Sequence, residues 1–164
     1  MPGSSPLYYW DACLFAAWIA DEQRPTGDMD GVREIIQRLK RREAIVITSV
    51  LTTTEVLECK MPAGVERQFK DLMKRLGRKS MDIRVAELAH DLRDHYSRKG
   101  EKALKTPDAI HLATAIHYRA DQFHTFDDKL LALSGNVGGH RLIVCKPESK
   151  SPQLDLRKPK PDEK

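Results

Sequence analysis

Cysteine is scarce in this 164-residue chain, and the shortage argues against two classes of small protein. The cysteines Cys13, Cys59 and Cys145 form no Cys-x-x-Cys pair and are odd in number. A disulfide framework and a zinc knuckle both need paired thiols, so neither is expected. None of the histidines stands at a metal-ligand spacing. We therefore expect reduced, mostly buried thiols and a cytoplasmic location.

The sequence also lacks a long apolar run. The apolar stretch nearest the N-terminus, residues 12–20, is too short to cross a bilayer. No basic segment precedes it, so we predict neither a signal peptide nor a membrane partner. The length suits one domain with a proper core.

Short apolar segments alternate with amphipathic ones along the chain. Strands are predicted at residues 7–10, 44–48, 121–125 and 141–145. Helices are predicted at 11–21, 30–43, 62–77, 82–100, 106–119 and 127–133, with one more after Ser49. The expected N-caps of three of these helices are Asp30, Asp82 and Thr106. This alternation favours an α/β fold with a central parallel sheet in three layers. We expect one domain over residues 1–146 and a disordered, basic, proline-rich tail over 147–164.

Acidic residues stand where predicted strands give way to helices. They are Asp11, Glu55, Asp108 and Asp127. In a parallel α/β sheet such positions converge on the crevice at the carboxyl ends of the strands. Carboxylates gathered there repel one another, and divalent metal ions would neutralise them, as in metal-dependent phosphodiester chemistry. Each acid taken alone could instead cap a helix or complement its dipole.

Four segments carry a resemblance to a known family. YYWDA, ITSVLTTTEVLE, TPDAIHLATAI and FHTFDDKL resemble the signature blocks of PIN domains, especially the small VapC-type toxins, over residues 7–145. The resemblance implies a Rossmann-like sandwich and a Mg²⁺- or Mn²⁺-dependent endoribonuclease that cleaves RNA. It also implies a homodimer and an antitoxin partner. The catalytic and metal-binding acids of the family map onto Asp11, Glu55, Asp108 and Asp127.

Two departures from the family pattern affect the site. Ala12 stands where Ser or Thr is common, so one hydroxyl near the metal ligands is missing. The fourth block has two adjacent acids, and the pattern favours Asp127 over its neighbour as the ligand. We expect further polar groups around the ligands at Glu58, Thr106, Thr125 and Asp128. His111 is interpreted as a core or surface residue, and Trp10, Trp18, Tyr8 and Tyr9 as core or interface residues.

The oxygen ligands select a hard cation, magnesium or manganese rather than zinc. The net charge is +4 and the pI is about 9.0, which suits a polyanionic substrate. Basic residues that could hold an RNA backbone are Arg41, Arg42, Arg78, Lys79 and Lys105. The same residues could equally be solvated helix ends.

Two other functions remain open from the sequence. A receiver-type signalling module also has acids at strand ends, although Asp11 stands alone where receivers carry an acidic pair. A PIN-fold domain without turnover, binding RNA or protein, would keep the same pattern of acids.

Overall fold

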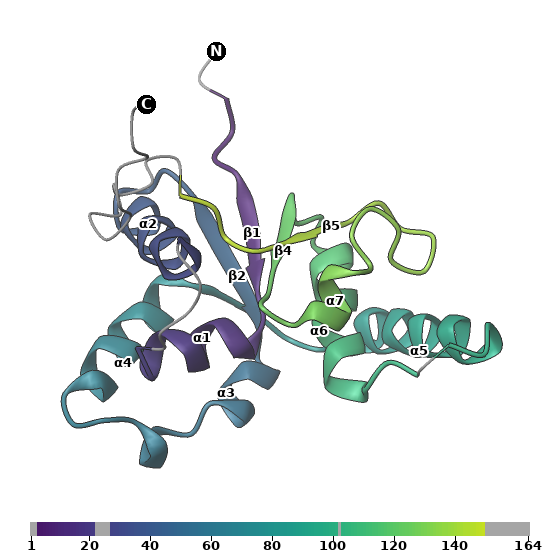
Figure 1. The fold of residues 1–164 in the computed structure, drawn as a ribbon, viewed down its shortest axis with the longest axis horizontal. Helices are drawn as coiled ribbons and strands as arrows, with labels where there is room; N and C mark the ends of the chain where they lie inside the picture. The colour runs from purple at the N-terminus through teal and green to yellow at the C-terminus, as the bar shows by residue number, and fades with distance from the viewer. Residues whose placement is uncertain (1–2, 22–26, 102, 150–164) are drawn as a thin grey trace, which may run out of the picture.

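The computed structural model describes residues 3–21, 27–101 and 103–149, and short strands alternate with helices through most of it (Figure 1). The strands are β1 Leu7–Trp10, β2 Ile45–Ser49, β3 Gly77–Lys79, β4 Gln122–His124 and β5 Ile143–Cys145. The helices are α1 Ala12–Ile19, α2 Asp28–Lys40, α3 Leu51–Glu55, α4 Val65–Arg75, α5 Ile83–Arg98, α6 Thr106–His117 and α7 Asp128–Leu131. A 3₁₀ helix, η1 Glu58–Lys60, joins α3 to α4.

The strands form one parallel sheet in the order β3-β2-β1-β4-β5. β1 lies at the centre, where Tyr9 pairs with Ile47 of β2 and with Phe123 of β4. The carboxyl ends of all five strands therefore meet at one edge of the sheet, as predicted for the four strands that the sequence indicated.

Alternate residues of β1 point to opposite faces of the sheet, and each face has its own core. Tyr8 and Trp10 pack with α1, α2 and α4, whereas Tyr9 packs with α5 and α6. Figure 1 shows these two groups of helices on opposite sides of the sheet. The side-chain period of two in a strand produces this division. The predicted three-layer α/β architecture, with Tyr8, Tyr9 and Trp10 in the core, is confirmed.

β3 was not predicted from the sequence. Residues 62–77 were predicted as one helix, but α4 covers only Val65–Arg75 and Gly77 begins an edge strand. The strand GRK has neither apolar alternation nor β-branched residues, so local patterns do not mark it. Its pairing beside β2 brings Gly77 so close to Ile47 that a Cβ would lie 2.9 Å from the isoleucine Cγ2.

Helix starts were predicted with mixed success. Asp82 caps α5 as expected, since its Oδ1 accepts from the Val85 N–H at 3.0 Å. Thr106 was expected to cap α6, but it is the first helical residue and Lys105 occupies the cap position. α2 begins at Asp28, ahead of the predicted cap Asp30, because Gly27 takes a left-handed conformation with φ 93°.

The chain after β5 lies along α2. Lys146 Nζ donates to Asp28 at 3.1 Å, and Ser149 Oγ lies 2.6 Å from a carboxylate oxygen of Glu34. Pro147 is buried, whereas residues 150–164 of the predicted tail lie outside the described residues. Among the helices described, none is long and apolar enough to span a membrane.

Candidate active site

The candidate site lies where the strand order reverses. From β1 the sheet continues to β2 and β3 on one side and to β4 and β5 on the other. Open α/β sheets bind ligands in the crevice at such a switch point, outside the carboxyl ends of the strands. Asp11 directly follows β1, and Asp127 follows the neighbouring β4. The topology thus places these two acids at the same crevice.

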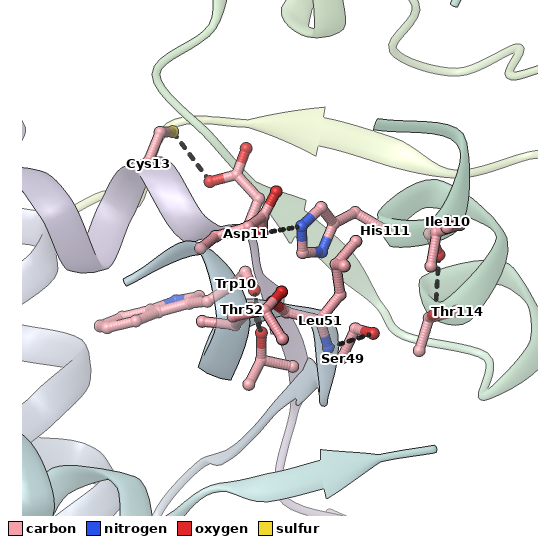
Figure 2. A network of polar contacts seen from close by, with 12 residues as sticks. Trp10, Asp11, Cys13, Ser49, Leu51, Thr52, Ile110, His111 and Thr114 are labelled. Carbon is pink, nitrogen blue, oxygen red and sulfur yellow. Dashed lines mark hydrogen bonds and ion pairs between the residues drawn. The ribbon is translucent and has the colours of Figure 1, made fainter. Parts of the chain in front are cut away.

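Asp11 is a buried carboxylate held by two side-chain donors. Its residue is only 5% exposed, and Thr125 Oγ1 donates to its Oδ2 at 2.6 Å. Cys13 Sγ donates to its Oδ1 at 2.8 Å, and Figure 2 shows this thiol turned toward Asp11. Burial raises the pKa of Asp11, and the hydrogen bonds from Cys13 and Thr125 oppose that rise. The donors compensate for the hydroxyl missing at Ala12.

Thr125 connects two of the acids through its hydroxyl group. Its hydroxyl donates to Asp11 and accepts the backbone N–H of Asp127 at 3.0 Å. Asp127 is half-buried, and its Oδ1 accepts from the Lys129 N–H at 2.8 Å, which caps α7. The capping interpretation of Asp127 is therefore correct, and the cap leaves Oδ2 for another partner.

Asp108 lies in the first turn of α6 and is half-buried. Burial raises its pKa, and the negative charge of Asp127 and then that of Asp11 raise it further. Mutual repulsion of this kind requires the three carboxylates to lie within electrostatic range of one another. Asp11, Asp108 and Asp127 are therefore gathered from β1, α6 and the end of β4.

Glu55 joins the group through a contact that the sequence analysis did not foresee. It is the last residue of α3, and its Oε2 lies 2.7 Å from His111 Nε2. His111 is 2% exposed, and its Nδ1 lies 2.6 Å from the Tyr9 hydroxyl. His111 is thus a core histidine, as interpreted, but it also contacts a candidate ligand. The sequence did hold one sign of this contact. His111 stands three residues after Asp108 on the same helix, and residues at that spacing share a face, so His111 could have been placed toward the acids.

Three other predicted residues lie apart from the acids. Glu58 forms an ion pair with Lys70 at 3.4 Å, because α3 ends at Glu55 and the chain changes direction before η1. Thr106 is exposed and lines a groove against α5. Asp128 is exposed in the first turn of α7. None of these has a hydrogen bond to the four acids among the described residues.

The predicted RNA-binding residues divide between the two edges of the sheet. Arg41 and Arg42 precede β2, so they lie at the amino edge, away from the acids. Arg78 and Lys79 are in β3, and the Lys79 ammonium lies 4.8 Å from the centre of the Tyr118 ring. Lys105 is exposed next to α6, and its charge lowers the pKa of Asp108.

The donor set fits a hard divalent cation. All four candidate ligands offer carboxylate oxygens, the ligands that magnesium and manganese prefer. Among the described residues, no three Asp, Glu, His or Cys side chains already stand close enough to enclose an ion. Magnesium retains several waters and uses one or two carboxylates with substrate phosphates, so an enclosed cage is not required. Burial raises the pKa of Asp11 and, together with the charges of Asp127 and Asp11, that of Asp108, and a bound cation would favour the ionised form of both.

A groove of about 550 Å³ opens beside the acids. α1 contributes Ala12, Cys13 and Ala16, and the opposite wall includes Glu55 and Leu57. The groove is mostly apolar, and Glu55 and Lys60 are its charged side chains, so it suits a largely apolar partner.

Fold and crevice together define a three-layer α/β protein with an acidic site at its topological switch point. The PIN domain matches residues 8–136, and the chain belongs to the PIN-domain family. No curated protein matches it.

Solved structures of similar fold include VapBC2 from Rickettsia felis bound to a DNA fragment from their promoter. That chain has a TM-score of 0.60 and 14% identity, covering 84% of this chain and 98% of that one. A chain of a toxin–antitoxin complex from Klebsiella pneumoniae has a TM-score of 0.56 and 24% sequence identity, and the match covers 82% of this chain and 99% of that chain. FitAcB from Neisseria gonorrhoeae has a TM-score of 0.59 and 15% sequence identity, and the match covers 85% of this chain and 97% of that chain. At these identities the likeness concerns the fold.

Proposed function

We propose that this protein is a Mg²⁺- or Mn²⁺-dependent endoribonuclease that cleaves RNA phosphodiester bonds. The observation that carries the proposal is the gathering of Asp11, Asp108 and Asp127 at the switch point, where burial and then the charges of Asp127 and Asp11 raise the pKa of Asp108. The family match supports the same chemistry, since the matched residues 8–136 include all four acids.

Each acid has a distinct part in the proposed reaction. Asp11, Asp108 and Asp127 would hold the cation, and Glu55 would orient a water or share a second ion. The ion, when bound, supplies positive charge for the scissile phosphate and lowers the pKa of water toward neutrality. Thr125 keeps Asp11 and Asp127 at a fixed separation through its two hydrogen bonds. Lys105 lies where it would attract the RNA backbone beside Asp108.

The decisive experiment compares two single-charge changes. Asp108→Asn is expected to abolish cleavage of single-stranded RNA while circular dichroism shows an unchanged fold. The matched control is Asp128→Asn, which removes the same charge from an exposed carboxylate and should keep wild-type turnover. Wild-type turnover should vanish in EDTA and return with Mn²⁺. An Asp108→Asn protein that cleaves at the wild-type rate would refute the assignment.

We also propose that the protein is the toxin of a toxin–antitoxin pair. The similar folds include chains from VapBC and toxin–antitoxin complexes. The groove beside Cys13 and Glu55 would receive an apolar antitoxin segment carrying a cationic residue that pairs with Glu55. Growth arrest on expression, dependent on Asp108, tests toxicity directly.

A homodimer and a cytoplasmic location stay predictions. Met81 and Ile83, 50% and 70% exposed beside the start of α5, offer an apolar surface for a second copy. Light scattering of wild type and an Ile83→Glu variant would test the dimer.

Of the two alternative functions, one is excluded by the sheet topology and one stays open. Receiver modules have the strand order 2-1-3-4-5, whereas this sheet has β3-β2-β1-β4-β5, so the receiver interpretation is wrong. A PIN domain without turnover remains the second candidate, and the EDTA experiment separates it from the nuclease.

A further inference from the structure

His111 lies inside a chain of hydrogen-bonding groups that runs from the sheet to Glu55. The backbone N–H of Ser49 donates to the Tyr9 hydroxyl at 3.0 Å. That hydroxyl lies 2.6 Å from His111 Nδ1, and His111 Nε2 lies 2.7 Å from Glu55 Oε2. Tyr9 and His111 are both buried, so each polar atom needs a partner. Figure 2 shows His111 among the polar groups around Asp11.

Counting donors and acceptors assigns the protons in this chain. The Tyr9 oxygen already accepts from Ser49, and its own proton can go to His111 Nδ1. A proton on Nε2 is then donated to Glu55, whose carboxylate oxygen accepts it. The other tautomer would set an unprotonated Nε2 against a carboxylate oxygen, leaving neither with a donor. The Nε2–H form satisfies every group.

We propose that His111 is a positioning residue, whose Nε2–H fixes one oxygen of Glu55 and leaves the other to serve the cation. This inference rests on the proposed function. α3 is only five residues long and ends at Glu55, so the helix itself restrains that side chain little. Among the described residues, Glu55 Oε1 has no hydrogen bond, whereas Oε2 is held by the buried ring. Polar groups that orient ligands in this way change metal affinity or activity by about 10- to 100-fold when removed.

Two substitutions of His111 distinguish the contact made by Nδ1 from the contact made by Nε2. The amide of His111→Gln reaches about as far as Nε2 and can still donate to Glu55. The amide of His111→Asn reaches only as far as Nδ1, so it can meet Tyr9 but not Glu55. We expect His111→Asn to lower kcat and Mn²⁺ affinity by about 10- to 100-fold, with His111→Gln restoring most of the loss and KM for RNA little changed.

A double-mutant cycle shows whether His111 acts through Glu55. In a Glu55→Gln background, His111→Asn should cause no further loss of kcat or Mn²⁺ affinity, because the carboxylate it orients is gone. Equal losses in both backgrounds would show that His111 acts by another route and would overturn the proposal.

A measurement on the metal-free wild type needs no activity. Long-range ¹H–¹⁵N correlation NMR should show His111 protonated at Nε2 and unprotonated at Nδ1. The Nδ1–H tautomer would overturn the proposal even if the variants fold poorly. The two hypotheses fail separately. A wild type that neither binds Mn²⁺ nor cleaves RNA defeats the nuclease, whereas an active wild type matched by an equally active His111→Asn defeats only the positioning role.

Discussion

Acid should weaken the fold through His124, a buried histidine next to the candidate site. His124 is 1% exposed, and its Nδ1 accepts the Trp10 indole N–H at 3.1 Å. Its Nε2 lies 2.9 Å from Gln122 Oε1, and the ring stacks on Tyr8 with centroids 4.7 Å apart. The imidazole is therefore neutral and protonated at Nε2. Adding a proton to Nδ1 would break the bond from Trp10, the residue that precedes Asp11.

The magnitude follows from the pKa. Burial lowers the pKa of His124 from 6.5 to about 4. Between these values the unfolded chain binds more protons than the folded one. The stabilisation is therefore present above pH 6.5 and is lost as the pH falls toward 4. A shift of about 2.5 pH units corresponds to about 3 kcal/mol of unfolding free energy.

The assay is urea unfolding in EDTA at several values between about pH 7.5 and 4.5, with His124→Asn beside the wild type. The asparagine does not titrate and can still accept from Trp10. At about pH 7.5 the free energy of unfolding of His124→Asn should be lower than that of the wild type. The difference between the two proteins should shrink by about 2 to 3 kcal/mol as the pH falls to about 4.5. Asp11 and Asp108 titrate in both proteins and cancel in the difference. The control His90→Asn removes an exposed histidine and should track the wild type. Parallel curves for His124→Asn and the wild type would refute the reasoning.

Three further predictions concern the site. Thr125→Val removes the donor to Asp11 and the acceptor for the Asp127 N–H, so kcat should fall by about 10- to 100-fold, with the exposed Thr106→Val as the control. Asp108→Asn should raise the melting temperature of the metal-free protein at about pH 7.5, and the gain should shrink on acidification. Because the pKa of Asp108 is raised in the folded protein, ionisation of Asp108 destabilises the fold as the pH rises, by under about 1 kcal/mol for this half-exposed group. A lower melting temperature for Asp108→Asn than for the wild type would contradict this prediction. Lys105→Ala should flatten the salt dependence of RNA binding, whereas Arg41→Ala, at the opposite edge of the sheet, should leave it unchanged; equal slopes for both would show that Lys105 does not contact the backbone.

The sequence predicted the features that local patterns encode. The apolar segment before Asp11 and the one before Asp127 marked β1 and β4, and parallel pairing of those strands places both acids at one edge. The continuous aromatic run Tyr8, Tyr9 and Trp10 was interpreted as core or interface, and all three residues are in the core, because both faces of a parallel sheet are covered.

Features that depend on tertiary pairing were missed. β3 is a strand only because Gly77 lies against β2, and nothing in GRK shows this. The contact between His111 and Glu55 joins residues 56 positions apart, so neither reveals it locally. Arg41 and Arg42 were proposed to bind RNA on their charge alone, although their place just before the predicted strand 44–48 already put them at the amino edge of the sheet, away from the acids.

Binding of Mn²⁺ tests the central claim most directly, because a cation site must exist before cleavage can depend on it. Calorimetric titration of the wild type should show saturable binding, weakened by Asn at Asp11, Asp108 or Asp127 and by Gln at Glu55, and untouched by Asp128→Asn. A wild type that binds no Mn²⁺ at millimolar concentration, or one whose affinity survives all four substitutions, would contradict the account.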